Sequence, residues 1–477
     1  MYKVKNALYS TAEFCTTCVL LIPKKYFQNI KSKMSMHSIN VMLKPASGMC
    51  NMCCKYCFYA DETKKRAITN YGLMSFDTLH SVLEKVLSEA TRSCTIAFQG
   101  GEPTLAGLPF FRQAISICKG KNVNHCSIYF AIQTNGLLID DEWCEFFVEN
   151  HFLVGISLDG PKELHDANRP DTVGKGTYSR VMHALQLLKS HGVDTNILTV
   201  VTADTAKNYR KAYNFFVRSG LDYQQYIPCL DPLDEPRGQQ PWSLTPERFE
   251  QYLKASFDCW YQDAMRGRKR YHRYFDNLLL MLNGQPPEAC GMLGTCGMQY
   301  VVEADGSVYP CDFYMLDQYK LGNLNTDTLA QIDARRKEIG FIEQSCAVDE
   351  KCKICKWYQL CRGGCRRDRD YYQDGIGRNY YCAAYERFFE YAWPKLGEVY
   401  EEVIRGQKED LQDVNFSVFG QFSGVNSRCN LRDWRRSYHQ TDSGFIPNGQ
   451  CVYDQLFIGL YGAFDEFVLC WQGIAGT

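Results

Sequence analysis

The sequence predicts an α/β protein, a partial (β/α)6 parallel barrel followed by a small cysteine-rich domain. Short apolar runs alternate with amphipathic stretches between residues 36 and 231, a pattern typical of parallel strands joined by helices. The chain also carries 24 cysteines, many of them close together beyond residue 290. Its 53 basic and 54 acidic side chains give a net charge of -1, which argues against a nucleic-acid or anionic-membrane binder.

The predicted strands follow one another along the first half of the chain. They are Ile39 to Leu43, Thr95 to Gln99, Ser127 to Thr134, Leu153 to Leu158, Thr195 to Val201 and Tyr223 to Pro228. This number of strands is smaller than a closed barrel of this type needs. We therefore expect an open barrel with its active site at the carboxyl ends of the strands.

Helical patterns separate these strands. Ser75 is the predicted N-cap of a helix whose apolar residues share one face, namely Leu79, Val82, Leu83, Val86 and Leu87. A second helix opens with acids at its positive end, Asp140, Asp141 and Glu142. A third carries an apolar stripe of Val181, Leu185 and Leu188.

The chain is predicted to divide into six segments. These are a poorly ordered N-terminal extension (1–35), the barrel (36–231), a helical connection (232–289), the cysteine-rich domain (290–385), a C-terminal helix (386–407) and an extension without an assigned role (408–477). Because the cysteine-rich domain shows weak periodicity, we expect it to fold around metal rather than around a hydrophobic core.

The start of the chain predicts a cytoplasmic protein. Its one short apolar run, Cys18 to Pro23, is followed by two lysines and resembles neither an export signal nor a membrane span. In a reducing cytoplasm, metal ligation is the expected use of clustered cysteines.

A loop directly after the first strand contains Cys50, Cys54 and Cys57 in a C-x3-C-x2-C pattern. Three thiolates on a cluster of four irons leave one iron without a protein ligand, and chemistry can take place there. The alternative is a zinc knuckle that uses the extra thiol of Cys53, but the next cysteine, Cys94, lies inside a predicted strand. We expect Cys53 to point away from the cluster.

A second group of cysteines lies downstream. It comprises Cys290, Cys296, Cys311, Cys352, Cys355, Cys361, Cys365 and Cys382, enough for two four-thiolate clusters. Asp305-Gly306 between two apolar runs predicts a hairpin turn, which would present Cys296 and Cys311 at neighbouring strand ends. Zinc remains an alternative here, because C-x2-C pairs alone do not distinguish the two metals.

The first cysteine loop closely resembles that of the radical S-adenosylmethionine (SAM) superfamily, including the aromatic Phe58 at its end. Gly100-Gly101-Glu102-Pro103 after the second strand resembles the glycine-rich motif of that family. The resemblance implies a [4Fe-4S] cluster on Cys50, Cys54 and Cys57 whose open iron binds SAM, which one electron cleaves to a 5'-deoxyadenosyl radical. It also implies SAM contacts from Tyr56, Gly101, Ser157, Arg169 and Leu230.

The downstream cysteine spacing resembles the SPASM extension of peptide-modifying radical enzymes. By that resemblance, one auxiliary [4Fe-4S] cluster is held by Cys290, Cys296, Cys311 and Cys365. The other is held by Cys352, Cys355, Cys361 and Cys382, so that the chain would bind three [4Fe-4S] clusters.

Within that group the resemblance is to the anaerobic sulfatase-maturating enzymes, over about residues 36 to 405. It rests on Phe98 to Gly107, Gln133 to Gly136, Ile156 to Gly160 and Cys311 to Phe313. These enzymes oxidise Cys or Ser in a Cys/Ser-x-Pro-x-Arg segment of a sulfatase polypeptide to Cα-formylglycine. The resemblance implies that Asp312 is the general base, that the auxiliary clusters accept the electron, and that a flavodoxin- or ferredoxin-like protein is the electron donor.

Two other functions stay open on the sequence alone. One is a SPASM radical SAM enzyme that crosslinks a precursor peptide, although residues 1–35 are too short for the added peptide-binding domain of such enzymes. The other is a non-catalytic iron-sulfur electron carrier, which would need a fourth ligand beside Cys50, Cys54 and Cys57. The sequence also leaves open whether the target residue is Cys or Ser.

Overall fold

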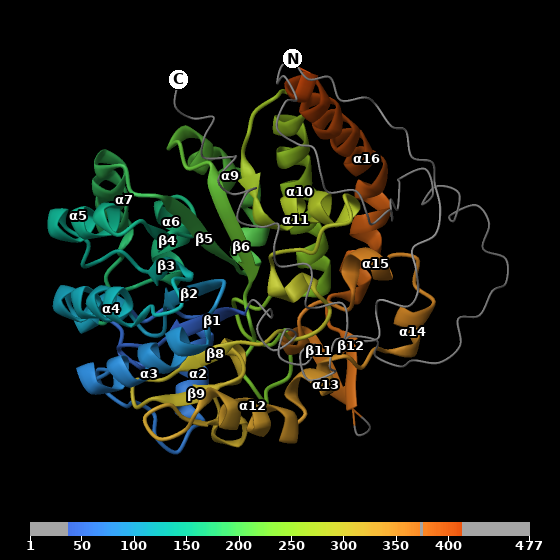
Figure 1. Cartoon of the computed structure of the whole chain (residues 1–477). Coiled ribbons are helices and arrows are strands. Elements are labelled where there is room, and N and C mark those ends of the chain that lie inside the picture. Colours follow the sequence, from blue (N-terminus) through green and yellow to red (C-terminus); the bar gives the residue numbers. More distant parts are fainter. Residues whose placement is uncertain (1–36, 373–374, 413–477) are drawn as a thin grey trace, which may run out of the picture. The chain divides into compact units, whose positions relative to one another are not determined.

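The computed structural model describes residues 37–372 and 375–412, and its central feature is a run of six parallel strands in sequence order (Figure 1). Each strand pairs in parallel with the next. The strands are β1 (Ser38–Leu43), β2 (Ser93–Phe98), β3 (Ser127–Thr134), β4 (Phe152–Ser157), β5 (Thr195–Val201) and β6 (Tyr223–Pro228). All six predicted strands are therefore confirmed, with small differences at their ends.

Helices follow the strands, as the sequence predicts. They are α2 (Phe58–Lys64), α3 (Phe76–Glu89), α4 (Leu108–Lys121), α5 (Asp141–Glu149), α6 (Lys162–Asn168), α7 (Tyr178–His191), α8 (Ala203–Lys207) and α9 (Tyr209–Arg218). The Ser75 side chain accepts a hydrogen bond from the backbone N–H of Thr78 at the start of α3. Asp140 caps α5 through the N–H of Trp143, so both predicted helix starts are confirmed.

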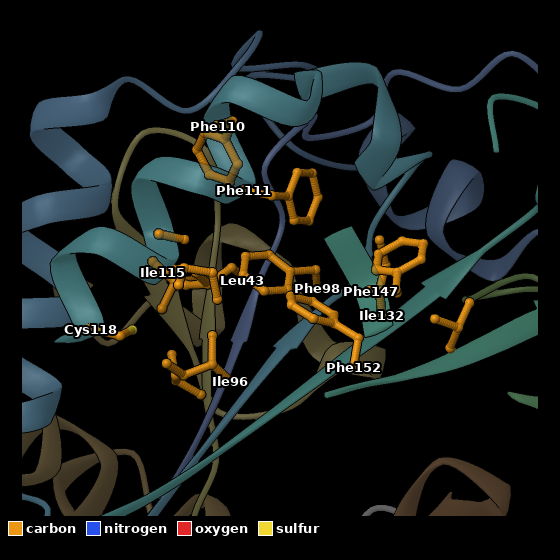
Figure 2. Close-up of a cluster of buried hydrophobic side chains, with 14 of the residues drawn as sticks. Leu43, Ile96, Phe98, Phe110, Phe111, Ile115, Cys118, Ile132, Phe147 and Phe152 are labelled. Atoms are coloured by element: carbon orange, nitrogen blue, oxygen red, sulfur yellow. The ribbon is translucent and has the colours of Figure 1, made fainter. Parts of the chain in front are cut away.

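A hydrophobic core lies between the strands and the helices that cover them (Figure 2). Phe98 of β2 is fully buried, and its ring centroid lies 4.8 Å from that of Phe111 and 6.1 Å from that of Phe152. Burying a side chain of this size stabilises the fold by about 1.5–3 kcal/mol. The packing holds the strands in register, so their carboxyl ends form one edge of the sheet.

The sheet extends beyond the six predicted strands, because short strands from later in the chain join both of its edges. They are β7 (Tyr271–His272), β8 (Tyr300–Val302), β9 (Ser307–Tyr309) and β10 (Gly322–Asn323), and the strand order is β10-β9-β8-β1-β2-β3-β4-β5-β6-β7. Strand β8 pairs in parallel with β1. The predicted hairpin turn at Asp305-Gly306 joins β8 to β9, where Gly306 adopts φ +85°.

The second half of the chain is mostly helical outside these strands. Its elements are α10 (Pro246–Ala264), α11 (Arg273–Leu282), α12 (Leu329–Glu338), α13 (Phe341–Ser345), α14 (Glu350–Lys353), α15 (Tyr358–Cys361), α16 (Cys382–Gln412) and the antiparallel pair β11 (Arg369–Tyr372) and β12 (Gly375–Asn379). Helices α10, α11 and α16 share a second core that includes Phe257, Phe275 and Phe388.

One expectation about the cysteine-rich region is wrong. This region does contribute to hydrophobic cores: Leu329 and Ile332 of α12 lie in the core of the barrel. Trp357 and Leu360 lie in the second core. The region was expected to lack a core because its helices are short, and a short helix leaves little room for an apolar period to repeat.

Both terminal extensions lie largely outside the described residues. Residues 1–35 and the part of the C-terminal extension beyond residue 412 fall outside them, so their predicted states stay predictions. Among the helices that are described, none has the length and apolar character needed to cross a membrane.

Candidate functional site

The loop between β1 and α2 brings Cys50, Cys54 and Cys57 together. Burial raises the pKa of Cys50 to about 12, and the neighbouring Cys54 and Cys57 contribute to the increase. Burial likewise raises the pKa of Cys54 to about 11. Cys53 is exposed, whereas the three predicted ligands are partly buried. The loop thus presents three adjacent thiols at the carboxyl end of β1, and thiolates are the ligands of iron-sulfur clusters.

The glycine-rich motif after β2 holds this loop from one side. The backbone N–H of Gly101 donates to the carbonyl oxygen of Ser47 at 2.9 Å, and that of Glu102 donates to the carbonyl oxygen of Met49 at 2.8 Å. A Cβ at Gly101 would lie 2.0 Å from the carbonyl oxygen of Met49. Glycine is therefore required here for the close approach of two backbones, whichever part of a cofactor Gly101 also contacts.

Glu102 and Asn135 extend this support to a thiol. The fully buried Glu102 carboxylate accepts hydrogen bonds from the hydroxyl of Thr134 at 2.7 Å and the backbone N–H of Asn135 at 2.8 Å. The Asn135 amide in turn donates to Asn51 Oδ1 at 2.7 Å and approaches Cys50 Sγ at 3.8 Å. Two strand ends thereby fix the position of the first cysteine.

Replacing Gly101 by Ala is expected to displace the loop, since the new Cβ would meet the backbone of Met49. We expect the iron content to fall by roughly one third, which corresponds to one of three clusters, and SAM cleavage to fall about 10-fold or more. Iron analysis and chromatography of 5'-deoxyadenosine measure both. Gly120→Ala is the control, because a Cβ there meets no atom within 4 Å; a normal iron content in Gly101→Ala would contradict the prediction.

Arg169 and Tyr56 lie on the other side of the loop, around a buried carboxylate. Arg169 Nε lies 3.1 Å from Asp159 Oδ2, and the Tyr56 hydroxyl donates to the same oxygen. Arg169 Nη1 also approaches Cys54 Sγ at 3.8 Å. Burial opposes the charge of Arg169, but Asp159 outweighs it and raises the pKa of the guanidinium. A cation is therefore kept beside the thiol group.

The remaining predicted SAM contacts lie at neighbouring strand ends. Ser157 is the last residue of β4, and its hydroxyl accepts a hydrogen bond from Gln133 Nε2 at 3.1 Å. Leu230 follows β6 and is half-buried. All five predicted contact residues thus lie at the carboxyl edge of the sheet, where barrel enzymes bind their substrates.

The downstream cysteines form two groups in space. Electrostatic interactions connect Cys311 with Cys365, Cys290 and Cys296. A second set connects Cys361 with Cys382, Cys352 and Cys355. These are the same two sets of four that the sequence resemblance implies, and four thiolates are a usual ligand set of a [4Fe-4S] cluster. Within the described residues, no three His, Cys, Asp or Glu side chains converge on a position for a single metal ion.

Asp312 lies beside Cys311, after β9, and is largely buried. Its Oδ1 forms an ion pair with Lys44 Nζ, and its Oδ2 accepts a hydrogen bond from Gln99 Nε2 at 3.1 Å. Lys44 directly follows β1 and Gln99 directly follows β2. Our sequence analysis did not assign a role to either residue, although a polar side chain at the carboxyl end of a barrel strand is a signal that could have revealed both.

Comparison with known families defines the class of this protein. A family model described as "Radical SAM superfamily" matches residues 45–216. A model described as "Iron-sulfur cluster-binding domain", SPASM, matches residues 294–356. The fold and the thiol groups are therefore those of a radical SAM protein with a SPASM domain. Its cofactors are [4Fe-4S] clusters and SAM, so the zinc alternatives are rejected.

Individual relatives narrow this class. The "Cysteine-type anaerobic sulfatase-maturating enzyme" of Clostridium perfringens is 47% identical over 362 residues, covering 76% of this chain and 98% of the relative. The "Serine-type anaerobic sulfatase-maturating enzyme" of Bacteroides thetaiotaomicron is 31% identical over 390 residues, covering 77% and 92%. A solved structure of native anSMEcpe with bound AdoMet and Kp18Cys peptide gives a TM-score of 0.74 at 46% identity, covering 77% of this chain and 100% of that one.

The chain belongs to the anaerobic sulfatase-maturating enzymes. The predicted function is confirmed at the level of this family, and the protein is a radical SAM oxidoreductase. The peptide-crosslinking and electron-carrier alternatives are therefore set aside.

Proposed function

We propose that this enzyme acts on a Cys rather than a Ser side chain of a sulfatase polypeptide, in a Cys-x-Pro-x-Arg segment, and oxidises it to Cα-formylglycine. The relatives described as cysteine-type are 43–47% identical to this chain, whereas those described as serine-type are 29–31% identical. The observation that carries the chemistry is the buried carboxylate of Asp312, which lies next to one thiol group and at the same sheet edge as the other.

The loop thiols and the strand ends around them form the proposed SAM site. Cys50, Cys54 and Cys57 hold the first [4Fe-4S] cluster, and the SAM contacts are Tyr56, Gly101, Ser157, Arg169 and Leu230. When bound, this cluster and SAM supply the radical that removes a hydrogen atom from Cβ of the target residue. The buried Arg169–Asp159 pair fixes Tyr56 beside this site, and the Asn135 amide fixes Cys50.

Asp312 is the proposed base. Oxidation of a thiol to an aldehyde-level carbon requires the loss of the thiol proton, and a carboxylate within hydrogen-bond reach can accept it. Gln99 orients the carboxylate through its hydrogen bond to Oδ2. The target thiolate is easier to oxidise than the thiol, so accepting the proton also favours the loss of the electron.

The two groups of four cysteines are the proposed sites of electron acceptance. Cys290, Cys296, Cys311 and Cys365 hold the auxiliary cluster next to Asp312, and Cys352, Cys355, Cys361 and Cys382 hold the other. A flavodoxin- or ferredoxin-like protein is the proposed external electron donor. We place the enzyme in the cytoplasm, because thiolate ligands need a reducing compartment.

A peptide assay tests this function. The anaerobically reconstituted enzyme is given SAM, dithionite and either a Cys-x-Pro-x-Arg peptide or its Ser counterpart. We expect conversion of the Cys peptide, detected as the mass loss from thiol to aldehyde and by hydrazine trapping of the product, about 10-fold or more faster than conversion of the Ser peptide. Cleavage of SAM without peptide oxidation would reject the proposal, and faster conversion of the Ser peptide would reject the Cys assignment.

A further inference from the structure

Lys44 is a fully buried lysine at the proposed active site. Lysine is almost never fully buried unless its charge is paired. The Lys44 ammonium forms an ion pair with Asp312 Oδ1 and lies 4.5 Å from the centroid of the Tyr59 ring. Both contacts favour a cation, so the charge of Lys44 is directed at the proposed base.

The backbone and stem of Lys44 are held in place. Its backbone N–H donates to the carbonyl oxygen of Val302 in β8 at 2.8 Å, and its carbonyl oxygen accepts from the N–H of Ser47 at 3.0 Å. Gly100 passes over the stem with φ +130°, and a Cβ there would lie 3.0 Å from Lys44 Cδ. The absence of a side chain at Gly100 thus leaves room for the buried lysine.

A second buried carboxyl, Glu62 of α2, lies near the pair without competing for the lysine. Neither of its oxygens meets the geometry of a hydrogen bond within the described residues. Burial raises the pKa of Glu62 to about 8, the charge of Asp312 adds to this, and Lys44, Arg367 and the N–H of Met315 oppose it. Near neutral pH Glu62 is therefore mostly uncharged, and the Lys44 cation remains available to Asp312.

We propose that Lys44 is a positioning residue that holds Oδ1 of Asp312, so that Oδ2 is the oxygen that accepts the thiol proton. The S–H bond of the target breaks and an O–H bond forms on Oδ2, with the cation retained on Lys44 throughout. A charge-assisted hydrogen bond fixes a carboxylate more firmly than a neutral one. This inference rests on the proposed function, in which Asp312 is the base.

A double-mutant cycle tests the proposal. Lys44→Met, Asp312→Asn and the double variant are reconstituted, and the ratio of formylglycine to 5'-deoxyadenosine is measured with the Cys peptide. We expect Lys44→Met to lower this ratio about 100-fold, through kcat and with little change in the KM for the peptide. Because Lys44 acts through Asp312, the double variant should match Asp312→Asn within about twofold.

Three results would overturn the proposal: a wild-type ratio in Lys44→Met, a change confined to KM, or a double variant well below Asp312→Asn. If Lys44→Met fails to bind its clusters, Lys44→Arg replaces it. The guanidinium would engage both carboxylate oxygens, so the ratio should fall about 10-fold, and a wild-type ratio would overturn the proposal. Lys85→Met is the control, because Lys85 bonds the carbonyl oxygens of Leu324 and Asp327 away from the thiol groups. A wild-type enzyme that makes no formylglycine would instead reject the proposed function.

Discussion

Replacing Asp312 by Asn is expected to lower formylglycine formation about 100-fold or more while SAM cleavage continues. Asparagine preserves the shape of the side chain, but its amide does not accept the thiol proton, and a general base typically contributes about 10²–10⁴ in rate. Parallel measurement of 5'-deoxyadenosine and of the aldehyde peptide separates the two steps. The variant should therefore cleave SAM without completing the oxidation.

Asp317→Asn is the matched control for this prediction. Asp317 lies five positions further along the chain and is exposed, and its carboxylate accepts a hydrogen bond from the N–H of Ala67 at 2.8 Å. The control should keep both activities. An unchanged aldehyde yield in Asp312→Asn would remove Asp312 from its proposed role, and loss of both activities would indicate a structural defect instead.

Replacing Cys54 by Ala is expected to abolish SAM cleavage. Cys54 lies in the centre of the three-thiol loop, interacts electrostatically with Cys57 and Asp159, and approaches Arg169. Its loss removes one of three ligands and leaves the buried guanidinium without a neighbouring thiolate. We expect the iron content to fall by roughly one third and 5'-deoxyadenosine to fall to the background level, measured by iron analysis and chromatography.

Cys53→Ser provides a control of the same residue type in the same loop. The Cys53 thiol is exposed, and the backbone N–H of this residue is already used by the carbonyl oxygen of Pro170 at 2.9 Å. Iron content and SAM cleavage should stay at wild-type levels. The opposite pattern, with loss in Cys53→Ser and retention in Cys54→Ala, would reassign the ligand from one cysteine to the other.

The strands and the first cysteine loop could be predicted from sequence because their signals are local. Buried parallel strands appear as continuous apolar runs, and β3, β5 and β6 have the predicted bounds. The cap of α3 by Ser75 is also a local signal, since donor and acceptor are three residues apart. In such cases the residues that decide the structure are neighbours in the chain.

Contacts between distant segments could not be predicted in the same way. Strand β8 has three residues, too few for a distinctive pattern, and its partner β1 lies more than 250 positions earlier. The Lys44–Asp312 pair follows from that pairing, so neither its existence nor the burial of Lys44 has a sequence signature. The grouping of Cys365 with Cys290, Cys296 and Cys311 came from the resemblance alone, because spacing does not specify it.

The pairing of β8 with β1 has a consequence for dissecting the protein. Leu43 and Lys44 lie between β2 on one side and the Val302 segment on the other. A fragment that ends before residue 300 would leave the hydrogen-bonding groups along this side of β1 uncovered, and such an uncovered strand readily pairs with a second molecule. Truncation at the end of the six-strand barrel would therefore produce a sticky edge rather than an autonomous module.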